Sequence, residues 1–253
     1  MKITFLGTGT SQGIPVIGCT HEVCLSKNKK DKRLRSSVAI QWDDETYVID
    51  CGPDFRQQML NQSIPRISGI LFTHFHADHT AGLDDIRPFT QRYGSLPIYA
   101  KKDVVDSLKE RFDYIFSKVN RYIGAPSLII NEIKNKPFEL NTVTINPIEV
   151  NHGNLKIFGY RFNNAAYITD AKMVSVEEKR KLKNLDVLVI NALRIDSHPT
   201  HFNLEEALEF ISEIKPQKAY LTHISHKLGF HDEVSKKLPK NVFLAYDGLN
   251  LDI

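Results

Sequence analysis

Three histidines and an aspartate lie within six residues, directly after a short apolar run. The segment 73–79 reads THFHADH and follows the apolar residues 69–72. Side chains two apart in an extended segment point the same way, so His74 and His76 can share one metal ion. Asp78 and His79 follow where the chain bends into a helix, and they can face a second ion. Mixed nitrogen and oxygen ligands with open positions are typical of catalytic zinc, manganese or iron.

The bulk properties of the chain fit one globular α/β domain over residues 1–253. Hydrophobic residues make up 42% and charged residues 25%, which is an ordinary balance for a soluble protein. The net charge is only +3, so attraction to phosphates requires a local patch or bound metal. The polar N-terminus and the three cysteines predict no signal peptide, no membrane span and no disulfide framework, and we expect a cytoplasmic location.

Strand-like and helix-like segments alternate along the chain. Short apolar runs predict strands at residues 3–6, 37–41, 46–49, 69–72, 97–100, 143–150, 158–162, 166–168, 186–190, 218–221 and 242–245. Helical patterns fall at residues 53–62, 83–93, 104–116, 176–183 and 204–214. Strand pairs in both halves, with helices between them, favour a layered α/β sandwich over a simple doubly wound sheet.

The spacing His-x-His-x-Asp-His after an apolar strand resembles the metallo-β-lactamase superfamily. Residues 5–10, Phe-Leu-Gly-Thr-Gly-Thr, are similar to that superfamily's first strand and turn. Asp50, which closes a strand, matches its usual structural aspartate. The resemblance implies a single-domain, four-layer αββα sandwich over nearly the whole chain.

The resemblance also implies further metal ligands, each at the end of a predicted strand. These are His152, Asp170 and His223. Two divalent ions, Mn²⁺ or Zn²⁺, are implied, one held by His74, His76 and His152 and the other by Asp78, His79 and His223. Asp170 would bridge the two ions.

A histidine before the last predicted helix points to one branch of the superfamily. His201 in Thr200-His201-Phe202-Asn203 resembles the His-Ser-Thr motif of the phosphodiesterase branch, where the histidine acts as general acid. Phe202 and Asn203 depart from that motif, although Asn203 can still cap the helix. The resemblance is greatest to the phosphodiesterases of the carbon–phosphorus lyase pathway, the PhnP-like branch. It implies a metal-dependent phosphoric diester hydrolase that attacks a small phosphodiester, such as a cyclic ribose or nucleotide ester, with a metal hydroxide. Asp78 would act in that reaction as a metal ligand and as an orienting residue.

Other functions remain open on the sequence alone. Bacterial tRNase Z enzymes, which process the 3′ end of tRNA, carry a long insertion between the third and fourth metal motifs. His152 and Asp170 are only 18 positions apart, which favours a small substrate over nucleic acid. A thioesterase or lactamase would not need His201, and a non-catalytic metal-binding scaffold would not need the complete ligand set. The resemblance also suggests a homodimer.

A second cluster predicts a structural zinc site. Cys19, His21 and Cys24 offer three ligands within six residues, and a closed tetrahedral site needs a fourth. The PhnP-like branch holds zinc with a Cys-x-Cys-x-x-Cys loop and a histidine three residues after the last catalytic histidine. His226 is that histidine here, and His21 replaces the middle cysteine. The alternative is a pair of free thiols near a surface histidine. Cys51 is expected to be a small buried residue.

Residues 27–35 form the most basic stretch, with four lysines and two arginines around Asp31. Such a stretch can steer phosphates or contact nucleic acid. No aromatic residue is interleaved for base stacking, so a solvated surface loop is the favoured interpretation.

Overall fold

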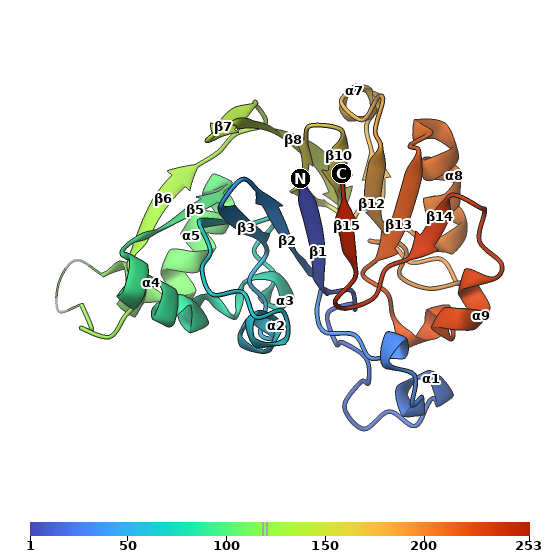
Figure 1. The fold of residues 1–253 in the computed structure, drawn as a ribbon, viewed down its shortest axis with the longest axis horizontal. Coiled ribbons are helices and arrows are strands. Elements are labelled where there is room, and N and C mark those ends of the chain that lie inside the picture. Colours follow the sequence, from blue (N-terminus) through green and yellow to red (C-terminus); the bar gives the residue numbers. More distant parts are fainter. Residues whose placement is uncertain (118, 120) are drawn as a thin grey trace. The chain divides into compact units, whose positions relative to one another are not determined.

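The computed structural model describes residues 1–117, 119 and 121–253, and these divide into two compact units. The first unit contains Met1–Leu6, Ser37–Lys134 and Asn250–Asp252. The second unit contains Gly7–Ser36, Asn135–Leu249 and Ile253. Figure 1 shows the elements of both units, each a β-sheet with helices. The prediction that residues 1–253 form one domain stays a prediction.

The first unit is built on a mixed seven-stranded sheet in the order β15-β1-β2-β3-β4-β5-β6. Its strands are β1 (Lys2–Gly7), β2 (Ser37–Trp42), β3 (Glu45–Ile49), β4 (Gly69–Leu71), β5 (Leu96–Ala100), β6 (Leu128–Glu132) and β15 (Asn250–Asp252). β2 and β3 form the predicted antiparallel hairpin, whereas β3, β4, β5 and β6 run parallel. Because parallel strands end at the same edge, the residues after β3 and β4 are brought together there.

Helices cover one face of this first sheet. They are α2 (Phe55–Asn61), α3 (Ala77–Thr80), η2 (Leu83–Ile86), α4 (Arg87–Tyr93), α5 (Lys102–Arg111) and α6 (Asp113–Phe116). Phe55 of α2, Phe89 of α4 and Leu108 of α5 pack in one buried cluster with Val48 and Ile70 of the sheet. This apolar cluster fixes the helices on the sheet and so holds the loop between β4 and α3 in place.

The second unit is built on an eight-stranded sheet in the order β11-β8-β9-β10-β12-β13-β14, with β7 paired to β8. Its strands are β7 (Phe138–Leu140), β8 (Val143–His152), β9 (Leu155–Phe162), β10 (Ala165–Tyr167), β11 (Met173–Val174), β12 (Val187–Asn191), β13 (Lys218–Thr222) and β14 (Val242–Leu244). β10, β12, β13 and β14 are mutually parallel, and β8 shares their direction because β9 is antiparallel to both β8 and β10. The strand ends that carry His152, Asp170 and His223 therefore lie at one edge of this sheet.

Helices of the second unit pack on that sheet through a second buried cluster. They are α1 (Glu22–Leu25), η1 (Lys29–Asp31), α7 (Val176–Arg180), α8 (Leu204–Ile214), η3 (His226–Leu228) and α9 (His231–Ser235). Ala207 and Phe210 of α8 lie in this cluster together with Ile190 and Leu221 of the sheet. The predicted helical stripe over 204–214 is thus confirmed, and so is the predicted cap, because the Asn203 side chain accepts a hydrogen bond from the backbone N–H of Glu206.

The structure differs from the sequence-based elements at one predicted helix and at four strands, and it also contains the short helices α1 and α9, which the sequence did not predict. The helix predicted over 104–116 is broken at Phe112, whose backbone leaves the helical region, so that α5 ends at Arg111 and α6 begins at Asp113. The sequence also missed β6, β7, β11 and β15. These strands are short, and β6, β11 and β15 lie at sheet edges, where one missing neighbour weakens the apolar pattern.

Arg33 and Asp31 correct the interpretation of residues 27–35 as a solvated loop. Both side chains are buried, and the Arg33 guanidinium donates hydrogen bonds to the Thr8 hydroxyl and the Ala245 carbonyl. The sequence could not show this because the partners are distant in the chain. Cys51 is fully buried, as predicted.

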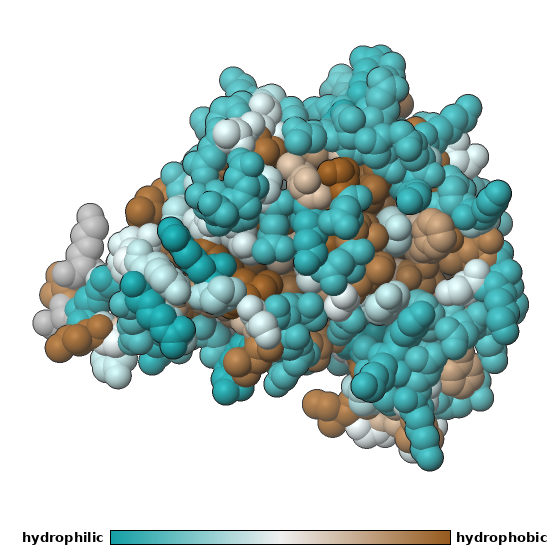
Figure 2. Space-filling view, in the orientation of Figure 1, coloured by the Kyte–Doolittle hydropathy of each residue, from teal (hydrophilic) through white to brown (hydrophobic). Residues whose placement is uncertain are grey.

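Surface side chains are mostly hydrophilic on the face shown in Figure 2, with smaller apolar areas between them. Within the part of the chain that the structure describes, no helix is both long enough and apolar enough to cross a membrane.

Candidate metal centre and catalytic residues

Asp50 organises the predicted ligands of the first unit. It follows β3 in a left-handed backbone conformation, with φ of 65°, and is fully buried. Its carboxylate accepts hydrogen bonds from the Thr73 backbone N–H at 2.8 Å and from the Thr73 hydroxyl at 2.8 Å. It also accepts one from Nδ1 of His79 at 2.7 Å. Because Nδ1 of His79 carries the proton, Nε2 is the nitrogen that can bind a metal. Asp50 is therefore a structural aspartate, as the resemblance implied.

The other histidines of the 73–79 segment are oriented in the same way. The Thr73 hydroxyl donates to Asp50, so it accepts the hydrogen bond from Nδ1 of His74 at 2.9 Å. Nε2 of His74 then faces Nδ1 of His76 at 3.0 Å. A carboxylate oxygen of Asp78 lies 3.2 Å from Nε2 of His79. Three imidazoles and a carboxylate with these orientations form a donor set that suits a divalent transition metal.

The second unit brings the other predicted ligands to one sheet edge. Nδ1 of His152 donates to the Thr200 carbonyl at 2.9 Å, so its Nε2 is available to a metal. Asp170 and His223 follow β10 and β13 and both have left-handed backbones, with φ of 57° and 53°. Nε2 of His223 lies 3.1 Å from Oδ1 of Asp170. Left-handed conformations are costly for residues other than glycine and concentrate at functional sites, which agrees with the predicted roles.

Asn191 fixes the backbone beside Asp170. It ends β12, is fully buried, and exchanges two hydrogen bonds with the backbone of Ala171, at 2.7 Å and 3.0 Å. The Asp170 carboxylate is further held by the Thr169 hydroxyl at 2.6 Å. The sequence analysis missed Asn191, although a buried amide at the end of an apolar strand was a signal that could have found it.

His201 lies beside these ligands. Its Nε2 is 3.0 Å from Oδ1 of Asp170, and its ring stacks on that of His223 with centroids 5.0 Å apart. The potential ligand atoms of His152, Asp170 and His201 lie within 4.8 Å of one another. Burial lowers the pKa of His201 to about 4, although the hydrogen bond to Asp170 opposes this shift. The ring is therefore neutral at pH 7 in the free protein, and an anionic substrate beside it would raise this pKa.

His198 is a neighbour of His201 that the sequence analysis missed. Its Nδ1 accepts the backbone N–H of Thr200 at 3.3 Å and lies 3.1 Å from Nδ1 of His201. The Thr200 hydroxyl reaches Nδ1 of His201 at 2.9 Å. In the neutral ring Nδ1 of His201 carries no proton, so the Thr200 hydroxyl donates to it, and Nδ1 of His198 can accept from it only when the ring is protonated. His198 could have been predicted from the sequence, because it lies three residues before His201 and just ahead of the residue that caps the helix.

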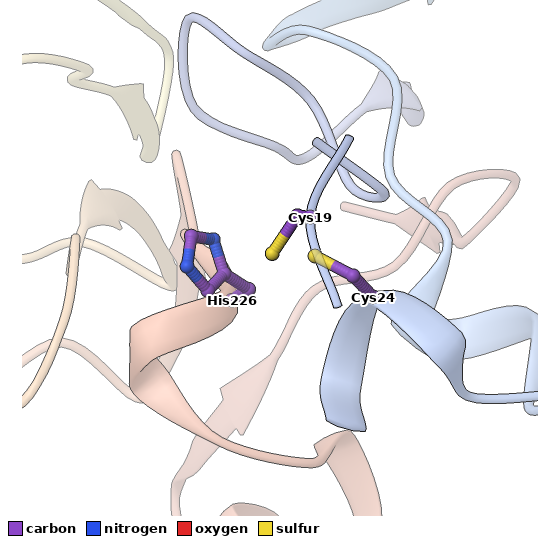
Figure 3. A group of neighbouring side chains, drawn as sticks. All are labelled: Cys19, Cys24 and His226. Atoms are coloured by element: carbon purple, nitrogen blue, oxygen red, sulfur yellow. The ribbon is translucent and has the colours of Figure 1, made fainter. Parts of the chain in front are cut away.

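The second predicted metal cluster is formed within the second unit. The potential ligand atoms of Cys19, Cys24 and His226 lie within 4.8 Å of one another. In Figure 3, Cys19 lies between the ring of His226 and Cys24. Nδ1 of His226 is buried and has no hydrogen-bond partner among the described residues. Burial lowers the pKa of His226, which leaves the ring in the neutral form that binds metals. Burial raises the pKa of Cys24, a shift that a bound cation would reverse.

His21 does not belong to this group of three. Its Nδ1 accepts the backbone N–H of Val23 at 3.2 Å and caps α1. Its ring lies 5.1 Å from that of His226, at 63° to it. Only Nε2 of His21 is left for a metal, and its role as the fourth ligand stays a prediction. Two thiols and a neutral imidazole are the donors that zinc prefers in structural sites.

Comparisons with known proteins agree with this arrangement. Residues 45–224 match the family model of the β-lactamase superfamily domain. A solved structure described as a new diphosphatase from the PhnP family superposes with a TM-score of 0.93, at 39% identity over 100% of this chain and 97% of that chain.

Two curated relatives of the chain have names that differ from that of the diphosphatase. The octanoyltransferase of Porphyromonas gingivalis is 40% identical over 98% of this chain but only 51% of its own length. The ribonuclease Z of Picrophilus torridus is 25% identical over 78% of this chain and 52% of its own length. The chain thus spans about half the length of these relatives.

Proposed function

Since the chain belongs to the metallo-β-lactamase superfamily, with the fold of a metal-dependent hydrolase close to PhnP-like proteins, we propose that it hydrolyses a small phosphodiester or diphosphate ester. The predicted superfamily and α/β fold class are confirmed by the family match and by the similarity to the diphosphatase structure. The substrate class is our inference. It includes cyclic ribose and nucleotide esters.

The observation that carries the proposal is the position of His201. Its Nε2 lies 3.0 Å from Asp170, at the edge of the sheet where the strands that lead to His152 and His223 also end. A histidine at this position can give a proton to a departing alkoxide, which a poor leaving group on phosphorus requires. Thioester and lactam hydrolysis by the superfamily does not need such a residue.

Divalent metal binding follows from the superfamily and from the donor atoms described above. We propose two catalytic ions, Mn²⁺ or Zn²⁺, held by the seven ligands predicted from the sequence. When bound, these ions would activate a water molecule and neutralise negative charge on the phosphate. A structural Zn²⁺ at Cys19, Cys24 and His226, with His21 as fourth ligand, would stabilise the loop before α1 against the segment after His223.

The residues of the chain supply the remaining steps. Asp50 fixes the tautomer of His79, and the Thr200 carbonyl fixes that of His152. Asp170 accepts a hydrogen bond from the Nε2–H of His201 in the resting protein and thereby orients the ring. Once the substrate anion raises its pKa, His201 takes up a second proton from water at Nδ1, and it can then donate the proton at Nε2 to the leaving oxygen and return to the neutral ring. Thr200 and His198 hold the opposite nitrogen during the transfer.

A ribonuclease Z-like activity is the second candidate, because the chain is 25% identical to such an enzyme over 201 residues. The short interval between His152 and Asp170 favours the small substrate, for the reason given above. The chain covers only about half of both relatives, 51% of the octanoyltransferase and 52% of the ribonuclease Z, and we do not extend octanoyl transfer to it because the donor atoms described above suit metal-dependent hydrolysis. A cytoplasmic location and a homodimer stay predictions.

A substrate panel tests the proposal. The metal-loaded protein is assayed with bis(p-nitrophenyl) phosphate, a cyclic ribose phosphate, a nucleoside diphosphate ester, precursor tRNA, a thioester and a cephalosporin. We expect the small phosphorus esters to have the highest kcat/KM. We also expect His201→Ala to slow esters with alkyl leaving groups by about 10²-fold or more, and nitrophenyl esters much less. Faster hydrolysis of the thioester or the cephalosporin would contradict the proposal, and faster cleavage of precursor tRNA would favour the second candidate.

A further inference from the structure

A cavity of about 540 Å³ opens in the second unit beside β14, the last strand of its sheet. It is lined by Lys30, Tyr220, His231, Asp232, Ser235, Lys236, Val242, Phe243, Leu244, Tyr246 and Leu249. These residues come from η1, β13, β14, α9 and the segment after β14 (Figure 1). None of them is a predicted metal ligand or His201, so the proposed hydrolysis does not account for this cavity. Its volume lies within the range of about 300–1,000 Å³ that small-molecule sites occupy.

His231 presents a hydrogen-bond donor to this cavity. Its side chain is 5% exposed, and its Nδ1 lies 3.1 Å from a guanidinium nitrogen of Arg33. Arginine can only donate, so Nδ1 of His231 must accept, and the proton of the neutral ring is on Nε2. No described residue accepts a hydrogen bond from Nε2. A buried imidazole whose N–H faces a cavity and has no acceptor in the protein favours a ligand that places a hydrogen-bond acceptor there.

Positive charge surrounds this donor. Nζ of Lys30 lies 4.7 Å from the centre of the Tyr246 ring, and Lys236 follows α9 at the rim. The one acidic lining residue, Asp232, already accepts a hydrogen bond from the Asn28 side chain at 3.0 Å. Arg33, directly behind His231, is buried beside Asp31 and Asp247, which balance its charge, so the positive charge of the lining comes from Lys30 and Lys236. The lining therefore favours an anion over a cation or a neutral ligand.

Aromatic rings form the other wall. Tyr220 and Phe243 stack with centroids 5.3 Å apart at an angle of 27°, and Phe243 is 40% exposed. Its accessible ring offers a flat apolar face next to the cationic groups. Nucleobases stack on such faces, whereas a simple inorganic anion gains nothing from them.

We propose that this cavity binds a nucleotide. The phosphate accepts hydrogen bonds from Nε2 of His231 and from the ammonium groups of Lys30 and Lys236, and the base stacks on Phe243. Two basic residues of the 27–35 stretch thus contribute to this site, the buried Arg33 and the cavity-lining Lys30. The site goes beyond the proposed hydrolysis and does not depend on it.

Calorimetric titration of the metal-loaded protein with adenosine 5′-monophosphate, adenosine and inorganic phosphate tests the proposal. Lys236→Glu should weaken binding of the nucleotide by at least about tenfold. Lys237→Glu is the matched control, because Lys237 is exposed and carries the same charge but does not line the cavity. It should change the affinity by less than about twofold. Phe243→Ala should weaken the nucleotide by about tenfold and leave the affinity for inorganic phosphate unchanged.

Turnover of bis(p-nitrophenyl) phosphate should be unchanged in all three variants, which separates this site from the metal centre. Nuclear magnetic resonance of the imidazole nitrogens gives a direct measurement, in which the Nε2 signal of His231 should shift when the nucleotide is added. Equal effects of Lys236→Glu and Lys237→Glu, or a His231 signal that the nucleotide does not move, would overturn the proposal. An unchanged nucleotide affinity in Phe243→Ala would overturn the assignment of the base to that ring.

Discussion

Replacing Asn203 by alanine removes two side-chain hydrogen bonds at the start of α8. Oδ1 of Asn203 accepts the backbone N–H of Glu206 at 2.9 Å, and Nδ2 donates to the Ile195 carbonyl at 3.0 Å. Asn203 is only 7% exposed, whereas Ile195 is 52% exposed, so water can replace the lost donor at Ile195 more readily than the lost acceptor at the helix cap. Loss of a helix cap costs about 1 kcal/mol. Loss of the hydrogen bond to the carbonyl of Ile195, a residue that is 52% exposed, costs about 1 kcal/mol more.

We therefore expect Asn203→Ala to lower the free energy of unfolding by about 2 kcal/mol, and Tm by about 4–8 °C for a chain of this size. Denaturant and thermal unfolding of the metal-loaded protein measure both quantities. Asn203→Ser is the informative control, because serine still caps the helix but cannot donate to Ile195 in the same way. It should recover about half of the loss, the share of the cap alone. If alanine costs less than about 0.5 kcal/mol, or serine is no better than alanine, this account of the capping site is wrong.

Three further predictions concern the candidate site and the buried charges. His198→Ala should lower turnover of alkyl phosphodiesters by about tenfold, with a much smaller effect on nitrophenyl esters, because it removes a contact to Nδ1 of His201; equal losses on both would assign His198 a purely structural role. Asp50→Asn should weaken metal affinity by about 10–100-fold, measured by competition with a chelating dye, because the amide no longer fixes the tautomer of His79; unchanged affinity would contradict this. Burial and the adjacent Arg33 lower the pKa of His231 to about 4. The stability that the neutral His231 ring contributes is therefore complete above pH 6.5, the pKa of histidine in the unfolded chain, and is lost as the pH falls through 4. The unfolding free energy should drop by about 2 kcal/mol over that window after allowing for solvent screening, and His231→Asn should reduce this pH dependence rather than keep it.

Features with local causes were predictable from the sequence. The loop at 73–79 follows a buried strand, as its apolar neighbours indicated, and Asn203 caps α8 because both members of the capping box lie within four residues. The three cysteines were also separated correctly into a buried one and a clustered pair.

Features that depend on distant partners were not predictable. Arg33 is buried because Ala245 and His231 accept its hydrogen bonds, and both lie about two hundred residues away in the chain. His198 gains its role from the turn that brings its ring to His201, not from a motif. The break at Phe112 is equally hidden, because the apolar pattern continues across it.

Metal content, measured together with turnover, tests the central claim most directly. The purified chain is analysed for metals before and after chelation and assayed each time with bis(p-nitrophenyl) phosphate. The account predicts about three divalent ions per chain, of which one zinc resists chelation, with turnover lost when the other two are removed and restored when they are returned. Phosphodiester turnover that survives complete removal of the metals, or bound metal without any such turnover, would contradict it.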